Sequence, residues 1–444
     1  MVATLRRLKG NVKILILIEP LWGIPYNLIA PLATLYMVAL GVTDVQLGIL
    51  LSAGLVCQVF FAIGGGIMAD KLGRHRTTML GDLFGWSLAC AVWAISGNYW
   101  FFLVAVVLNC FEQVNQSAWI CLLVEDAKQE DIMHMFTWIA IGGLVTVFIA
   151  PLSGLLIRQF SLVPVARGIY ALFSVTMLFK SMITWRFCKE TKPGRKRMED
   201  VRGMSLRAML TESVQTAKSL LQKRATAFLL PITMLLSVTS MITTSFSALY
   251  MNSVLGISEQ WITAFPIITA LVQITFLFAL QRLMDRLRLK PPLATGVLLL
   301  IVCQLLLVLC PPGSIGVIAL YVLLNSCAMA MIYPRREALL AKHMDPNNRA
   351  RSISIFGACN LLLSAPFGYV AGRLSGIDRR LPFLYCYCVV HHFTRADVVF
   401  SRQRSFVGRR GGKIKFDFLY KLSCMIKPPR KAAASRRFFA RSAG

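Results

Sequence analysis

The chain has 444 residues, of which 56% are hydrophobic, and its mean hydropathy is +0.63. A soluble domain averages about 45–50% apolar residues, so the composition excludes an ordinary soluble protein. The net charge of +28 at pH 7 would suit a nucleic-acid-binding protein. However, the basic residues are concentrated between long apolar runs, and this pattern favours a membrane protein instead.

Eleven apolar runs are each long enough to cross a bilayer as a helix, which takes roughly 18 or more apolar residues. Lipid offers the backbone no hydrogen-bond partner, so these runs are expected to be helical. The first run is too long to be a cleavable signal peptide and is expected to stay in the chain. The predicted spans are 13–40, 46–68, 78–97, 100–123, 133–157, 164–185, 226–250, 260–280, 291–311, 315–333 and 352–372.

The basic residues lie mainly on one side of these spans. If the N-terminus is inside and each span reverses the chain, the inner segments up to residue 372 hold 28 Lys and Arg, whereas the outer segments hold only Arg158 and Arg167. This is the positive-inside bias of membrane proteins, and it predicts a cytoplasmic N-terminus.

The first span contains polar side chains and is interrupted by prolines. Glu19, Tyr26 and Asn27 lie within it. Polar groups inside spans usually face a cavity, and prolines are tolerated in spans whose freed backbone groups find other partners. We therefore take these three residues as candidates for a substrate or proton pathway.

The loop between the second and third spans is short and charged. It reads GIMADKLGRHR from Gly66 to Arg76. Gly66 and Gly73 would allow backbones to approach closely, and Asp70 can pair with basic neighbours or meet the positive end of a helix. A charged loop that serves topology alone is the alternative.

This loop resembles the signature loop, motif A, of the major facilitator superfamily, Gly-x-x-x-Asp-Arg/Lys-x-Gly-Arg-Arg/Lys, at every position except His75. The resemblance covers residues 1 to about 380 and favours a bacterial member with an aberrant C-terminus. It implies an all-α membrane fold of two six-helix bundles related by a pseudo-twofold repeat. It also implies a gating role, holding the bundles together in the outward-facing state, for Gly66, Asp70, Lys71, Gly73, Arg74 and Arg76.

The fourth span is the most polar. Asn109, Glu112, Gln113 and Gln116 recur at helical spacing and give it one polar face, with Glu112 near the middle of the membrane. A carboxyl group in a medium of low dielectric constant favours its neutral form. Glu112, and after it Glu19, could therefore carry a proton; a neutral, hydrogen-bonded structural acid is the alternative for each.

Two family features bear on coupling and direction. Many proton-coupled members carry an arginine in the fourth span, and this chain has none there. The antiporter pattern of the fifth span, Gly-x-x-x-Gly-Pro-x-x-Gly-Gly, is kept at Pro151 and Gly154, but Thr146 and Ala150 replace its first two glycines. Export by antiport is therefore favoured only slightly over uptake.

No pattern indicates a metal or another cofactor. The acidic loop after the fourth span holds Glu125, Asp126, Glu130 and Asp131, which we expect to pair with basic inner loops rather than bind a metal. The cysteines lie mostly singly in apolar runs and form no CxxC pair. Motifs typical of an enzyme are also missing.

A polar segment divides the spans into two groups. Residues 1–186 predict an N-terminal six-helix bundle, 187–224 a cytoplasmic linker and 225–385 a C-terminal bundle. The linker begins with the basic stretch KETKPGRKRMED, which predicts a solvated loop. Apolar residues at helical spacing follow, and they predict an amphipathic helix on the inner membrane surface; a linker helix without lipid contact is the alternative.

The two groups of spans also share short sequence matches at equivalent places. Asp70-Lys71-Leu72 corresponds to Asp285-Arg286-Leu287, and Ala150-Pro151 to Ala365-Pro366, both at an offset of 215 residues. Such repeats are typical of transporters with the substrate site between the halves. In the second group, Gln273, Asn325 and Asn360 are further pathway candidates, with helix-to-helix hydrogen bonding as the alternative.

Residues 386–444 do not fit a twelfth span. Residues 391–444 hold fourteen Lys and Arg against two Asp, and a charge at a helix centre costs about 2.5–3.5 kcal/mol. The twelfth helix is thus degenerate or missing, and the basic tail is expected to be disordered. A coding frame lost near residue 385 is preferred over a lipid-binding or nucleic-acid-binding extension.

These observations predict a secondary active transporter, not an enzyme, that moves a small molecule across the inner (cytoplasmic) membrane by alternating access, with protons as a candidate coupling ion. We expect a multi-pass monomer in the lipid bilayer, without cofactor or nucleic-acid partner. The alternatives are a membrane-embedded binding or scaffold protein that no longer transports, or the truncated or frameshifted product of a transporter gene.

Overall fold

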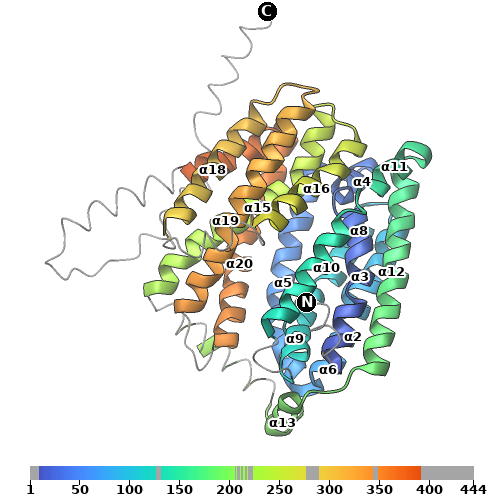
Figure 1. Cartoon of the computed structure of the whole chain (residues 1–444), viewed down its shortest axis with the longest axis vertical. Coiled ribbons are helices and arrows are strands. Elements are labelled where there is room, and N and C mark those ends of the chain that lie inside the picture. Colours follow the sequence, from blue (N-terminus) through green and yellow to red (C-terminus); the bar gives the residue numbers. More distant parts are fainter. Residues whose placement is uncertain are drawn as a thin grey trace, which may run out of the picture. The chain divides into compact units, whose positions relative to one another are not determined.

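The computed structural model describes residues 10–126, 132–205, 207, 211, 214–215, 218, 224–276, 290–343 and 349–391. The predictions for the amphipathic linker helix, for Asp285-Arg286-Leu287 and for the tail beyond residue 391 lie wholly or mostly outside these residues. Within them every regular element is a helix, as predicted (Figure 1). The chain divides into two compact units, residues 1–386 and 387–444. The helices from α2 to α20 lie in the first unit.

The helices of the first unit are α2 (Asn11–Ile18), α3 (Pro20–Ile29), α4 (Ala33–Ala39), α5 (Asp44–Leu72), α6 (Arg74–Asp82), η1 (Leu83–Leu88), α7 (Ala89–Ile95), α8 (Tyr99–Asn109), α9 (Glu112–Val124), α10 (Ile132–Val147), α11 (Pro151–Phe160), α12 (Leu162–Phe187), α13 (Lys192–Asp200), α15 (Arg224–Ser253), α16 (Glu259–Thr275), α18 (Lys290–Val308), α19 (Ile315–His343) and α20 (Arg349–Ile377).

Eight helices in the described part of the chain are long and apolar enough to cross a membrane. They match eight of the predicted spans, and α16 and α18, which border on undescribed residues, match the eighth and ninth. The last apolar helix of the described residues, Leu381–His391, borders on undescribed residues and is, as far as it is described, shorter than a span. This agrees with the prediction that the twelfth helix is degenerate.

The predicted fourth span is two helices rather than one, because α8 ends and α9 begins in its middle. At the break the amide of Phe111 bonds to the carbonyl of Leu108, and the amide of Val114 to the carbonyl of Phe111, both at 3.0 Å. These bonds join residues three apart, so the chain tightens there to a 3₁₀-like turn, a feature that often marks a functional hinge.

A wider turn lies beside this tight one. η1 is a π-helical segment in the middle of the third predicted span. A Cβ atom on Gly85 would lie 2.8 Å from the backbone nitrogen of Glu112, so only glycine allows η1 to approach the start of α9 so closely. The two irregular turns therefore pack against each other.

The prediction of a loop for KETKPGRKRMED is wrong, because most of this stretch forms α13. The Thr191 side chain caps the helix by accepting a hydrogen bond from the amide of Gly194 at 3.0 Å. Pro193 lies in the first turn, where its missing N–H costs nothing. These local signals outweigh the polar character of the segment.

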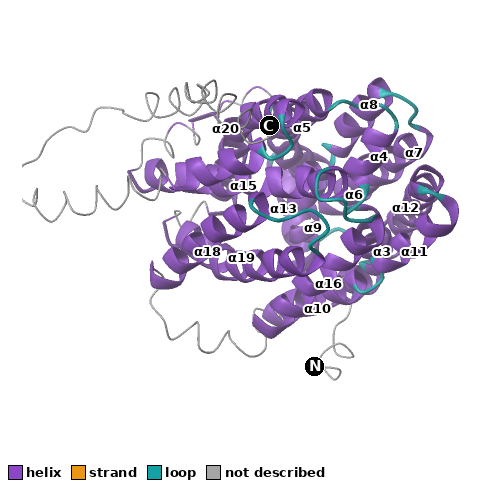
Figure 2. Cartoon of the chain, turned by 90° about the horizontal axis from the view of Figure 1, so that it is seen from above, coloured by secondary structure: helices purple, strands orange, loops and turns teal. Residues whose placement is uncertain are grey.

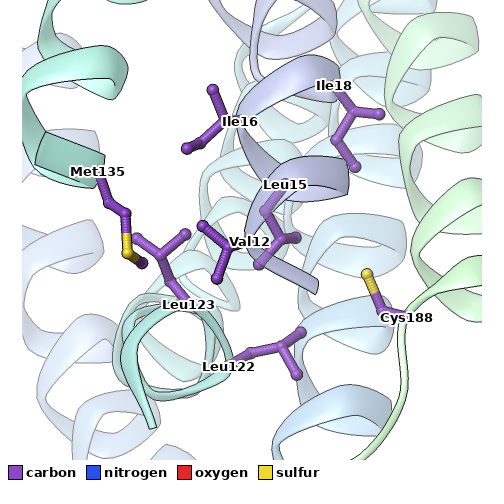
Figure 3. Close-up of a cluster of buried hydrophobic side chains, with 8 residues drawn as sticks. All are labelled: Val12, Leu15, Ile16, Ile18, Leu122, Leu123, Met135 and Cys188. Atoms are coloured by element: carbon purple, nitrogen blue, oxygen red, sulfur yellow. The ribbon is translucent and has the colours of Figure 1, made fainter. Parts of the chain in front are cut away.

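An apolar cluster connects α2 with α9 and α10 near the end of the unit that carries α13. Figure 3 shows α2 side chains pointing toward those of α9 and toward Met135 of α10. Trp119 and Trp138 pack against this cluster. Its buried members are Val12, Leu15, Ile16, Ile18, Leu122, Leu123, Met135 and Cys188.

The helices α5 and α20 lie side by side (Figures 1 and 2). A Cβ atom on Gly48 would lie 2.7 Å from the Cα of Gly372, so the two backbones touch. The Ser52 hydroxyl donates to the carbonyl of Ala365 at 2.6 Å and accepts from the amide of Tyr369 at 2.7 Å. Small residues allow this close approach, as at many helix contacts in membranes.

The ends of these two helices are joined by charge. The carboxylate of Asp44, the first residue of α5, accepts hydrogen bonds from Arg379 at 3.1 and 3.2 Å and from the Ser375 hydroxyl at 2.6 Å. A second contact forms where α11 meets α16, since a Cβ atom on Gly154 would lie 2.9 Å from the Cα of Gln260. We call the end of the unit at which both contacts lie, that of Asp44 and that between α11 and α16, the Asp44 end.

Replacing Gly372 with alanine should lower the stability of the protein, because the added Cβ atom meets the backbone of α5 and overpacking costs about 1–3 kcal/mol. Gly357, also on α20, is the matched control, since a Cβ atom there meets no described atom within 4 Å. The measurement is the thermal unfolding midpoint in detergent. A midpoint for Gly372→Ala at or above that of Gly357→Ala would contradict the backbone contact.

Candidate functional site

The turn between α5 and α6 depends on Gly73. Its φ of +89° is readily adopted only by glycine, and a side chain there would collide with the carboxylate of Glu190. That carboxylate accepts hydrogen bonds from the amides of Arg74 and His75, both at 3.0 Å. Glu190 thus stabilises the positive N-terminus of α6.

Asp70 lies at the centre of a charged network at this end of the unit, which we call the motif end. Its carboxylate pairs with Arg74 at 3.0 Å and with Arg197 of α13 at 3.2 Å. Arg74 also contacts Glu125 at 3.3 Å, and Glu125 accepts a hydrogen bond from the Thr191 hydroxyl. The expected pairing of the acidic loop with inner bases is therefore found at Glu125.

The other predicted motif residues make fewer contacts in this conformation. Lys71 and Arg76 are exposed, as is Gly66. A Cβ atom on Gly66 would meet no described atom within 4 Å. The positive φ of Gly73 and its contact with the Glu190 side chain explain that glycine. The predicted close approach of two backbones is found at neither Gly66 nor Gly73 among the described residues.

The polar residues of the fourth span differ in their surroundings. Asn109 accepts a hydrogen bond from the Trp93 indole at 2.8 Å and donates to the carbonyl of Gly85 at 2.7 Å. Gln113 donates to Gln58 at 3.5 Å, and Gln116 is exposed. Asn109 therefore bridges α8 to the third span, and it is less available to a ligand than the sequence suggested.

Glu112 begins α9 at the break in the fourth span. Its side chain is partly exposed and makes no hydrogen bond or ion pair with the part of the chain that the structure describes. It lies within electrostatic range of Tyr26 and Asp82. A carboxylate so placed can interact with a proton or a ligand.

A buried lysine that the sequence analysis did not single out joins two acids. The Nζ of Lys180 lies 3.3 Å from Glu19 and 3.9 Å from Asp82, and Asn115 donates a hydrogen bond to Asp82 at 2.6 Å. The side chains of Lys180 and Asp82 are 5% and 1% exposed. We call Glu19, Asp82 and Lys180 the buried triad; it connects the junction of α2 and α3 with α6 and α12.

The sequence contained the signal for this triad. Lys180 interrupts the sixth predicted span, and a base inside a membrane needs an acidic partner. Of the two acids proposed as proton carriers, Glu19 is thus ion-paired, whereas Glu112 has no ion pair with any described residue. Among the described residues no group of three or more His, Cys, Asp or Glu could hold a metal ion.

The remaining candidates of the first span lie on α3. Tyr26 is 37% exposed and stacks on Trp22, with ring centroids 4.6 Å apart. Asn27 donates hydrogen bonds to the carbonyl of Gly23 at 2.8 Å and to the hydroxyl of Thr146 at 2.9 Å. Thr146, which replaces a glycine of the antiporter pattern, therefore connects α10 to α3.

The candidates of the second group of spans are more scattered. Asn360 donates a hydrogen bond to Ser237 at 2.9 Å, the carbonyl oxygen of Asn325 is buried without a hydrogen-bond partner among the described residues, and Gln273 is exposed. The residues that the structure brings together most closely are thus those of the first six spans.

Comparisons with known proteins agree on the architecture. A family model described as Major Facilitator Superfamily matches residues 21–369, whereas no curated protein sequence matches the chain. The structure of the nucleoside transporter NupG is similar, with 14% identity, a TM-score of 0.66 and coverage of 90% of this chain and 100% of that one. A POT family transporter in complex with 5-aminolevulinic acid is also similar, with 14% identity, a TM-score of 0.67 and coverage of 88% of this chain and 96% of that one. The xylose transporter XylE from E. coli, in its inward-open conformation, has 12% identity, a TM-score of 0.62 and coverage of 86% of this chain and 94% of that one.

Replacing Lys180 with methionine should destabilise the protein by about 3–5 kcal/mol, the usual cost of breaking a buried ion pair. The double variant Lys180→Met, Asp82→Asn should recover part of this loss, because it also removes one of the unpaired charges. Lys189→Met, at an exposed position, is the control. Thermal unfolding in detergent measures the effect, and a single variant as stable as wild type would show that the triad is not a stabilising contact.

Proposed function

Because this chain belongs to the major facilitator superfamily, we propose that it moves a small molecule across the cytoplasmic membrane by alternating access. Family membership makes it a multi-pass secondary transporter rather than an enzyme. The excess of Lys and Arg on one side of the predicted spans supports a cytoplasmic N-terminus, which puts the motif end in the cytoplasm. We propose that the protein works as a monomer.

The observation that carries this proposal is the tight contact at the Asp44 end. There Gly48 touches Gly372, and Asp44 is held by Arg379. At the motif end, Asp70 pairs with α6 and α13. A transporter facing the cytoplasm requires contact at the outer end, together with a motif that pairs with its own bundle and the linker rather than with the second bundle.

We assign the motif loop the role of the inner gate. In the opposite, outward-facing state the loop would meet the second bundle, and Asp70 would exchange one of its present partners, Arg74 or Arg197. Gly66, Lys71 and Arg76 are exposed in the present conformation, so they remain available for that contact.

Asp70→Asn should slow transport roughly tenfold, which corresponds to about 1.4 kcal/mol of barrier, because it removes the charge on which the motif network depends. Asp200→Asn, at an exposed acid of α13, is the control for the loss of one negative charge outside the motif, and its effect should be smaller. The measurement is the initial rate of substrate counterflow in proteoliposomes, with a panel of small molecules used to find the substrate. Wild-type rates in Asp70→Asn would eliminate the gating role.

We further propose that protons drive the cycle through Glu112, with export slightly favoured. Glu112 has no ion-pair partner among the described residues, whereas Glu19 is held by Lys180. A carboxylate without a fixed cation can gain and lose a proton more freely than one in an ion pair. The break between α8 and α9 puts this group at a turn that can change shape during the cycle.

Glu112→Gln should abolish flux driven by a pH gradient, because glutamine keeps the size of the side chain but cannot exchange a proton. Counterflow, which moves no net protons, should persist at saturating substrate. Glu199→Gln, at an exposed acid of α13, is the control for the loss of one negative charge. Gradient-driven flux that survives in Glu112→Gln would move the proton site to Glu19.

The short last helix favours a second candidate function. The described part of this helix, Leu381–His391, is shorter than a span, and charged residues follow it in the sequence, so a membrane-embedded binding protein that no longer transports is the alternative. Absence of counterflow for the whole substrate panel, with a folded protein in the liposomes, would support this alternative.

A further inference from the structure

Four aromatic side chains from three helices form one cluster beside Glu112. Trp22 and Tyr26 of α3 stack at 4.6 Å between ring centroids. Trp86 of η1 meets them edge-on at 5.6 and 6.2 Å, and its other neighbour is Phe173 of α12, stacked at 5.1 Å. We call these four residues the aromatic cluster.

The cluster extends from a buried ring to an accessible one. Phe173 has 1% of its surface exposed, whereas Tyr26 is 37% exposed. A ligand can therefore reach Tyr26, and the electrostatic interaction of Tyr26 with Glu112 puts the accessible ring near that carboxylate.

Acidic side chains outnumber basic ones next to the cluster. Among the described residues of the spans, three acids lie in this region, namely Glu19 and Asp82 of the triad and Glu112, against one base, Lys180. The side-chain carbonyl oxygen of Asn115 is also buried without a hydrogen-bond partner among the described residues. Ionising all three acids in a medium of low dielectric constant is costly, and a bound cation would lower that cost.

The backbone is irregular at this point. Trp86 belongs to the π-helical segment η1, and π-helical turns occur frequently at functional sites. The neighbouring Gly85 lets η1 approach to within contact of the backbone of Glu112. The irregular turn therefore brings the segment that carries Trp86 next to the backbone of Glu112, whose carboxylate has no ion-pair partner among the described residues.

We propose that this site binds an organic monocation with a flat or aromatic apolar body as the transported substrate. The positive charge lies against Glu112, and the apolar body against Trp22, Tyr26 and Trp86, whose ring faces attract cations. This proposal rests on the proposed transport function but concerns which chemical class the site selects.

The test compares two ions of the same shape and opposite charge, tetraphenylphosphonium and tetraphenylborate. Equilibrium binding of each to the purified full chain in detergent is measured, with binding to empty micelles subtracted. The phosphonium ion should bind at least tenfold more tightly than the borate ion, a difference of about 1.4 kcal/mol. Equal or tighter binding of the borate ion would overturn the proposal without the use of any variant.

Variants then locate the site. Glu112→Gln should weaken phosphonium binding roughly tenfold, and Trp86→Leu should weaken it severalfold, since a cation–π contact contributes about 0.5–2 kcal/mol. Trp185→Leu, at a 65% exposed tryptophan of α12 outside the cluster, is the control and should not change it. Wild-type affinity in a folded Glu112→Gln, or an equal loss in Trp185→Leu, would contradict the assignment.

The binding assay requires no transport, so its outcome is separate from that of the proposed function. Selective binding without counterflow would support the cation site and contradict transport. Counterflow of other substrates without selective binding of the phosphonium ion would support transport and contradict the cation site.

Discussion

The direct contact between the backbones of α5 and α20 determines which end of the molecule is closed. It depends on Gly48 and Gly372, because a Cβ atom at either position would meet the backbone of the other helix. Lipid provides no hydrophobic force between helices, so close packing of small residues provides much of the attraction. The Asp44–Arg379 pair adds a charged contact, which would break when this end opens in the proposed cycle. At the other end, Asp70 pairs with α6 and with α13 of the linker rather than with the second bundle.

The charges within the spans follow from the same environment. Lys180 is held between Glu19 and Asp82, which keeps α12 in place against α6 and the start of α3. Glu112 lies outside this triad, at a break in the fourth span, and remains free to interact with a proton or a cation. The structural acids and the proposed functional acid are thus distinguished by whether a lysine is within reach.

The parts of the fold that the bilayer dictates could be predicted from the sequence. Apolar runs gave the long helices such as α5 and α12, because a span must be apolar and helical. The break before Glu112 and the π-helical turn could not be predicted, because they depend on the packing of Gly85 against α9. Helix α13 depends on a local cap at Thr191, which the polar composition of the segment obscured. The candidate acids were visible in the sequence, but the pairing of Lys180 with Glu19 required knowledge of which helices are neighbours.

The central claim is that the two ends of the molecule open alternately, and distance measurements between spin labels test it most directly. One label pair, at exposed Gln159 and Ile377, reports on the Asp44 end, and a second, at exposed Lys71 and Thr275, on the motif end. Labels on genetically encoded ketone residues leave the buried cysteines in place. Alternating access predicts two populations, in which one distance lengthens as the other shortens when substrate or pH changes. A single unchanging distance at each end would contradict the account.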